Sequence, residues 1–104
     1  MINLNQLRVF YCVAKNLSFT KAAEDLFITQ PAVTAQVKHF EDWCELKLFK
    51  KKGRRIRLTD EGEMLYRKAR QLFEYEGQIE EVVNDYRELK KGVLLIGSTR
   101  TYAR

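Results

Sequence analysis

The sequence predicts a mainly α-helical fold with one small β-hairpin and a long C-terminal helix. Three observations support this prediction: apolar residues recur at helical spacing up to residue 44, a basic glycine-containing turn follows at 50–57, and residues 60–90 lack proline. A chain of 104 residues with 45% apolar residues can build one modest core but not two.

Residues about 4–16 are predicted to form a first amphipathic helix. Its apolar positions follow helical spacing: Leu7, Phe10, Val13, Ala14 and Leu17. A short second helix follows, with Ser18 or Thr20 as its N-cap. Its paired Ala22 and Ala23 suit a helix that crosses close to a neighbour, and Phe27-Ile28 is the expected turn.

Residues 29–44 are predicted to form a third helix that begins after an N-cap at Thr29. Pro31 is tolerated in the first turn, where no intrahelical donor is needed. One stripe along this helix is apolar: Val33, Val37, Phe40 and Cys44. The segment 18–41 is therefore expected to be two helices joined by a tight turn.

The face of the third helix opposite this stripe is small, polar and uncharged at its start. It holds Gln30 on the shoulder, Pro31, Thr34 and Ala35, with Lys38 further along. Small residues let a backbone approach base edges, glutamine pairs with adenine, and Ala or a Thr methyl contacts the thymine methyl. This face is therefore the candidate for base readout in a DNA groove.

Positive charge is concentrated in the N-terminal half. Residues 1–58 hold 11 Lys and Arg against 5 Asp and Glu, whereas residues 59–91 hold 6 against 9. Six of the eight residues from 50 to 57 are Lys or Arg, between apolar Leu48-Phe49 and Leu58. This pattern predicts a basic hairpin that binds a phosphate backbone or a narrow minor groove.

Residues 60–90 are predicted to form one long helix of roughly 45 Å, starting after Thr59 with acidic residues at its positive end. A 3-4 apolar spacing gives it a coiled-coil-like seam, which implies a partner helix from a second copy. The seam also includes Gly62, Ala69 and Glu76. The expected dimer contacts along it are Leu65, Leu72, Ile79, Val83 and Tyr86. A helix that folds back on its own domain is the alternative.

Several functional classes lack support in the sequence. There is no nucleophile–base arrangement, glycine-rich phosphate loop or metal-ligand spacing, so we expect no enzyme and no metal site. Cys44 suggests a thiol switch, but its place on the apolar stripe favours a core role. His39 is expected at the surface or its boundary. Apolar runs such as 93–96 are too short to span a membrane, and we expect no signal peptide.

The combination of these motifs resembles the LysR-type transcriptional regulators. The resemblance is dense over residues 4 to about 62, and the long helix matches by position and character. The matching residues are Leu7, Phe10, Ser18, Phe19, Ala22, Ala23, Leu26, Gln30, Pro31, Ala32, Val33, Gln36, Glu41, Leu48, Phe49, Arg54, Leu58, Thr59 and Gly62.

The resemblance implies a winged helix-turn-helix followed by a long linker helix. The protein would bind double-stranded DNA as a dimer that recognises an interrupted palindrome, with the linker helix pairing two copies and a tetramer allowed for the full-length protein. Residues 1–58 would be the DNA-binding domain and 59–91 the dimerisation helix. Residues 92–104 would begin a truncated effector-binding domain, with 91–97 as its first strand. No cofactor is expected within these residues, whereas a small-molecule effector is expected for the full-length protein.

The resemblance also suggests which residues contact DNA. Gln30, Pro31, Thr34 and Ala35 would face the major groove, and Arg54 is the wing residue suited to the minor groove. The remaining candidates would contact the DNA backbone: Ser18, Thr20, Lys21, Thr29, Lys38, Lys50, Lys51, Lys52, Arg55 and Arg57.

One departure from the family pattern affects the expected fold. Cys44-Glu45 stands where the family usually has Leu-Gly, so we expect the third helix to run a residue or two longer.

The leading hypothesis is a sequence-specific DNA-binding domain of a cytoplasmic, nucleoid-associated bacterial regulator. The alternative is a dimerisation or protein-interaction module whose basic hairpin binds an acidic partner.

Overall fold

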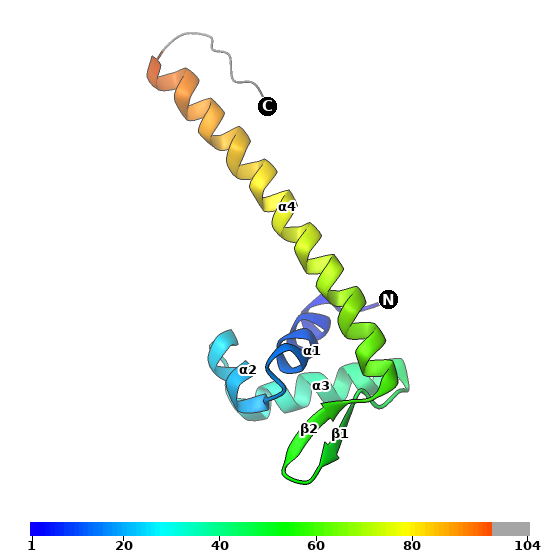
Figure 1. The fold of residues 1–104 in the computed structure, drawn as a ribbon. Helices are drawn as coiled ribbons and strands as arrows, with labels where there is room; N and C mark the ends of the chain where they lie inside the picture. The colour runs from blue at the N-terminus through cyan, green and yellow to red at the C-terminus, as the bar shows by residue number, and fades with distance from the viewer. Residues whose placement is uncertain (97–104) are drawn as a thin grey trace. The chain divides into compact units, whose positions relative to one another are not determined.

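The computed structural model describes the backbone of residues 1–96 and the side chains of residues 1–92. Six elements follow one another in the chain (Figure 1): α1 (Leu4–Asn16), α2 (Phe19–Leu26), α3 (Gln30–Cys44), β1 (Phe49–Lys52), β2 (Arg55–Leu58) and α4 (Asp60–Ile96). This confirms the predicted mainly helical fold with one hairpin and a long final helix. The chain divides into two compact units, Met1–Gln71 and Leu72–Arg104.

Each of the first three helices begins at a polar N-cap. Asn3 Oδ1 accepts the Gln6 N–H, Ser18 Oγ accepts the Lys21 N–H, and Thr29 Oγ1 accepts the Ala32 N–H. These bonds satisfy amide donors that have no partner inside the helix, which is why Ser, Thr and Asn are favoured there. The predicted caps at Ser18 and Thr29 are confirmed.

The same three helices end at residues in the left-handed region, and none of these is a glycine. Leu17, Phe27 and Glu45 have φ values of 50°, 58° and 59°. The expected extension of the third helix is wrong, because α3 stops at Cys44 and the Glu45 N–H donates to the Glu41 carbonyl. Glu45 thus adopts the conformation that glycine usually supplies, at a cost of about 1 kcal/mol.

The core of the first unit lies where α1, α2 and α3 pack together. Val9, Val13, Ala22, Ala23, Val33 and Val37 form its aliphatic part. The Phe10 ring packs against the rings of Phe40 and Phe49, with centroids 5.7 and 5.5 Å away, and Phe49 also contacts Phe19 at 5.7 Å. The hairpin is therefore anchored through its first residue to the same core as the helices.

The hairpin is antiparallel, with Phe49 opposite Leu58 and Lys52 opposite Arg55. Its loop is Gly53-Arg54, and Gly53 has a positive φ of 65°. Glycine at the first loop position suits the tight turns that match strand twist. The register puts Phe49, Lys51, Ile56 and Leu58 on one face and Lys50, Lys52, Arg55 and Arg57 on the other.

Helix α4 begins directly after the hairpin and continues to Ile96. The strand predicted at 91–97 is wrong for residues 91–96, which belong to α4. Residues 97–104, the rest of the predicted start of an effector-binding domain, lie outside the described part of the chain. Among the described residues no neighbouring strand is available to residues 91–96, so a helix satisfies their backbone groups locally. Among all the described residues, no helix is both long and apolar enough to cross a membrane.

Candidate nucleic-acid interface

The start of α3 presents an uncharged, solvent-exposed face. Gln30, Pro31, Thr34 and Ala35 are all exposed, whereas Val33 and Val37 on the opposite side are buried. The predicted division of this helix is therefore present in the structure. Cys44, the last member of the apolar stripe, is only half-buried.

A groove of about 650 Å³ lies between the start of α2, the start of α3 and the hairpin. It brings Gln30 together with the wing residue Arg54 and with four of the predicted backbone-contact residues: Ser18, Thr20, Arg55 and Arg57. Asn16, Leu17, Phe19 and Ile56 complete its lining. Thr20 Oγ1 donates to Gln30 Oε1 at 3.2 Å, so the amide group of Gln30 is oriented by its neighbour within the groove.

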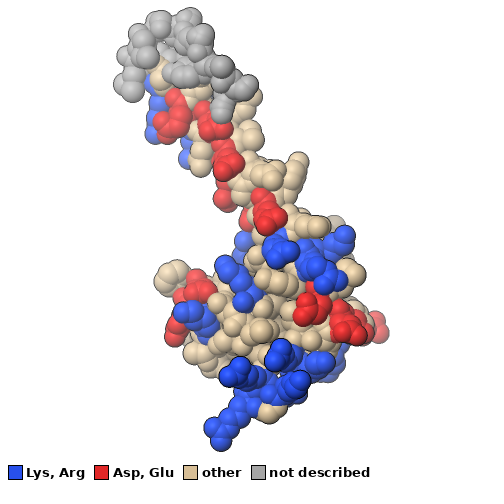
Figure 2. Space-filling view, in the orientation of Figure 1, with Lys and Arg blue, Asp and Glu red and all other residues tan. Residues whose placement is uncertain are grey.

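Lysine and arginine side chains gather over the hairpin in Figure 2. Two cross-strand pairs place like charges directly opposite each other, Lys50 with Arg57 and Lys52 with Arg55. Such pairs destabilise a sheet, so the hairpin carries a charge density that its own folding does not require. Lys50, Lys52 and Arg57 also line a second groove of about 380 Å³ with Glu63 and Tyr66.

The remaining predicted contact residues have different surroundings. Ser18 and Thr29 act as helix caps through their hydroxyl groups. Lys21 is exposed on α2. Lys51 is exposed as well, although the other residues on its face of the hairpin are apolar. The lining of the groove around Gln30 does not include Lys21, Thr34 or Ala35.

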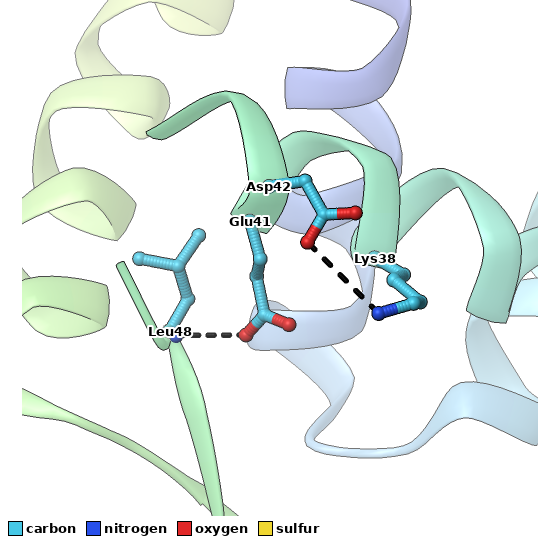
Figure 3. Close-up of polar contacts among 4 residues, drawn as sticks. All are labelled: Lys38, Glu41, Asp42 and Leu48. Carbon is cyan, nitrogen blue, oxygen red and sulfur yellow. Dashed lines mark hydrogen bonds and ion pairs between the residues drawn. The ribbon is translucent and has the colours of Figure 1, made fainter. Parts of the chain in front are cut away.

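Sequence reasoning missed the partner of Lys38. Lys38 Nζ lies 3.9 Å from Asp42 Oδ1, and both side chains are well exposed (Figure 3). The pair has i,i+4 spacing on a helix, which was a visible signal in the sequence. Asp42 therefore competes with any phosphate group that Lys38 would contact.

The predicted seam of α4 divides into two parts. Gly62 and Ala69 are buried inside the first unit, and Leu65 is half-buried. Leu72, Ile79, Val83 and Tyr86 are exposed, with Tyr86 at 65%. A shallow pocket of about 220 Å³ lies among Val82, Asp85, Tyr86 and Leu89. The apolar residues after 71 thus form a surface that a second helix could cover.

Both cysteines are free and half-buried, and the histidine is exposed. Burial raises the pKa of the Cys44 thiol, and the Glu41 carboxylate raises it further. Burial likewise raises the pKa of Cys12, with a further increase from Asp25. A raised pKa disfavours the reactive thiolate at neutral pH, which argues against a thiol switch at Cys44. His39 is exposed, and no metal-binding group of His, Cys, Asp or Glu occurs among the described residues.

Residues 4–63 match the protein family described as bacterial regulatory helix-turn-helix protein, lysR family. The chain belongs to the LysR family. The match spans α1, α2, α3, the hairpin and the first residues of α4, so it covers the groove around Gln30 and all of the basic hairpin. The resemblance found in the motifs is thereby confirmed.

Relatives within the LysR family include named regulators. The glycine cleavage system transcriptional activator of Escherichia coli (strain K12) is 49% identical over 70 residues, which cover 67% of this chain and 23% of the relative. The RuBisCO operon transcriptional regulator of Allochromatium vinosum is 37% identical over 100 residues, covering 96% and 33%. The chain therefore spans only a quarter to a third of these relatives. Because they are regulators, an enzymatic function gains no support from them.

Solved LysR-type structures share the fold. The BenM_DBD/benA site 1 DNA complex aligns with a TM-score of 0.75 at 30% identity, covering 83% of this chain and 97% of that one. The CbnR_DBD–DNA complex aligns with a TM-score of 0.70 at 27% identity, covering 83% and 99%. Both are crystal structures of DNA complexes, and their similarity to this chain confirms the fold class predicted from the sequence.

Proposed function

We propose that this chain binds double-stranded DNA in a sequence-specific manner, as the DNA-binding part of a LysR-type transcriptional regulator. The observation that carries this proposal is the groove in which Gln30 lies beside Arg54, Arg55 and Arg57. An uncharged helix start next to a cationic hairpin provides hydrogen-bonding groups for base edges and positive charge for phosphates on one surface.

The uncharged face of α3 would supply base readout through Gln30, Pro31, Thr34 and Ala35. The hairpin would supply charge: Arg54 at its tip for the minor groove, and Lys50, Lys51, Lys52, Arg55 and Arg57 for phosphates. The contacts to the DNA backbone would be completed by Ser18, Thr20, Lys21, Thr29 and Lys38. Residues 1–58 form the proposed DNA-binding domain.

Duplex titrations at several salt concentrations test the proposal. Binding of a random duplex should weaken linearly on a log–log plot between about 50 and 200 mM salt, because cations on the protein displace counterions from DNA. Absent duplex binding, or binding without salt dependence, would contradict the proposal and favour a protein-interaction module with an acidic partner.

The chain is proposed to act as a homodimer through residues 59–91, on an interrupted palindrome. The exposed apolar residues Leu72, Ile79, Val83 and Tyr86 support this arrangement, with Leu65 at its edge. The full-length protein would allow a tetramer, carry a small-molecule effector in a domain starting near residue 92, and work in the cytoplasm on the nucleoid.

Sedimentation of two charge variants tests the dimer. Ile79→Glu places a charge in the proposed seam and should give monomers, whereas Gln78→Glu places the same charge one exposed position away and should remain dimeric. Dimers in both variants would rule out this seam, and monomers in the unmodified protein would rule out the dimer.

A further inference from the structure

Leu48, the residue before the hairpin, is held by its backbone from two sides. Its N–H donates to Glu41 Oε2 at 2.8 Å (Figure 3), and its carbonyl accepts the Thr59 N–H at 3.0 Å. Its side chain is fully buried. Glu41 belongs to the last turn of α3, and Thr59 joins β2 to α4. One residue therefore connects α3, the hairpin and the start of α4.

The Glu41 carboxylate reaches the first residue of β1 as well. The Phe49 N–H points to the same oxygen at a longer 3.4 Å. A carboxylate that accepts backbone N–H groups makes charge-assisted bonds, which are stronger than those between neutral groups. Because the Phe49 ring is packed between Phe10 and Phe19, Glu41 and this ring fix the entry of β1 together.

The exit of the hairpin is fixed at the same place. Thr59 Oγ1 donates to the Lys47 carbonyl at 2.6 Å and accepts the Gly62 N–H at 3.0 Å. A Cβ on Gly62 would lie 2.2 Å from the Leu48 carbonyl oxygen, so only glycine allows this close approach. Both ends of the hairpin thus meet at Leu48, and the Glu41 side chain connects this point to α3 by a hydrogen bond.

The hairpin amplifies any movement at this point. A two-stranded hairpin is marginally stable by itself, and four residues per strand put its tip roughly 13 Å from its base. A rotation of about 10° at the base would therefore shift Arg54 by about 2 Å, which is enough to break a hydrogen bond.

We propose that Glu41 is a positioning residue for DNA binding, whose carboxylate sets the hairpin relative to α3 so that both engage one duplex. This inference rests on the proposed function. Glu41 itself would touch no DNA. Its neighbour Asp42 is turned instead toward Lys38 on the outside of α3 (Figure 3), and Glu45 is exposed.

Glu45→Gln is the matched control for Glu41→Gln. Both substitutions remove one negative charge near the end of α3, so any general gain in attraction to DNA is the same. Only Glu41→Gln changes a group that holds Leu48, since glutamine retains one accepting oxygen but loses the charge.

Amide hydrogen exchange of the free protein tests the contact without DNA. Glu41→Gln should accelerate exchange at Leu48 by about tenfold, since a charge-assisted bond becomes a weaker neutral one. Glu45→Gln should leave Leu48 unchanged, and core amides such as Val13 should keep their protection in both. Unchanged exchange at Leu48, or equal acceleration at Val13, would overturn the local role of Glu41.

A double-mutant cycle tests the consequence for binding. In the unmodified protein Arg54→Ala should weaken duplex binding by about tenfold. In the Glu41→Gln variant it should weaken binding only about twofold, because the hairpin is already misplaced. In the Glu45→Gln variant the tenfold loss should remain. An equal cost of Arg54→Ala in all backgrounds would overturn the proposal. If the unmodified protein binds no duplex, the proposed function fails, while the exchange experiment still decides whether Glu41 fixes the hairpin.

Discussion

The start of α3 and the hairpin border the same groove but are built from opposite kinds of residue. The exposed face of α3 is uncharged at Gln30, Pro31, Thr34 and Ala35, whereas the hairpin carries a cation at six of the eight positions from 50 to 57. Short uncharged groups distinguish bases, and cations bind every phosphate alike. The difference assigns sequence preference to α3 and most of the sequence-independent affinity to the hairpin.

The two regions also differ in what they cost the fold. The outward residues of α3 oppose a buried stripe and leave the core unaffected. In the hairpin, Lys50 faces Arg57 and Lys52 faces Arg55, so its charges repel one another in the free protein. A polyanion would relieve this repulsion, which makes the hairpin a region where stability and binding are opposed.

The largest expected effect separates the two regions directly. Gln30→Ala should weaken binding to the preferred site by about 1–3 kcal/mol and have a much smaller effect on random duplex. The physical reason is the loss of a hydrogen-bonding pair with a base edge. Titrations of both duplexes measure this, and equal losses on the two would remove Gln30 from base readout.

Lys50→Ala should show the opposite pattern. We expect weaker binding to all sequences and a salt slope smaller by about one for each protomer, because one phosphate contact is lost. The check is the slope of log K against log salt. Lys90→Ala, in the part proposed for dimerisation, serves as the control. A slope that stays the same in Lys50→Ala would show that the hairpin makes no phosphate contact there.

Asp42→Asn should strengthen binding of any duplex by about twofold, because it frees Lys38 from an exposed pair that is itself worth little. The gain should disappear when Lys38 is also replaced by Ala. A gain that persists in the double variant would mean that Asp42 acts through its charge alone.

The smallest effect concerns stability. Lys52→Thr should raise the free energy of unfolding by about 0.3 kcal/mol, because it removes a like-charge pair with Arg55, while it weakens duplex binding. Thermal melting measures the first change. Lys51→Thr, opposite the apolar Ile56, should bring no such gain, and an equal rise in both variants would attribute the effect to strand propensity.

Periodicity predicted the helices and the face of α3, and the glycine-containing basic turn between apolar residues predicted the hairpin. Val33, Val37 and Phe40 repeat at the spacing of one helix side, and that side is buried. Capping residues gave the helix starts, since Ser18 and Thr29 have short side chains that reach a backbone N–H.

Helix ends were harder to predict because their usual signal is missing. Leu17, Phe27 and Glu45 adopt left-handed conformations without being glycine. At Phe27 and Glu45 the backbone N–H donates to a carbonyl in the last turn of its helix, so the helix is closed by backbone bonds that no residue type announces. The strand predicted at 91–97 needs a neighbouring strand for its backbone hydrogen bonds, and the described residues offer none there. Residues 91–96 form backbone hydrogen bonds within α4 instead. Long-range contacts such as Glu41 with Leu48 leave no periodic pattern, and only the structure brings them together. The proposed DNA contacts of individual residues stay predictions.

Selection of bound fragments from random duplex, with the unmodified protein and with Gln30→Ala in parallel, tests the division between α3 and the hairpin most directly. The unmodified protein should enrich an interrupted palindrome, and Gln30→Ala should lose preference at one matching position in each half-site while still binding DNA. Absence of an enriched sequence, or an unchanged preference in Gln30→Ala, would contradict the assignment of sequence recognition to α3.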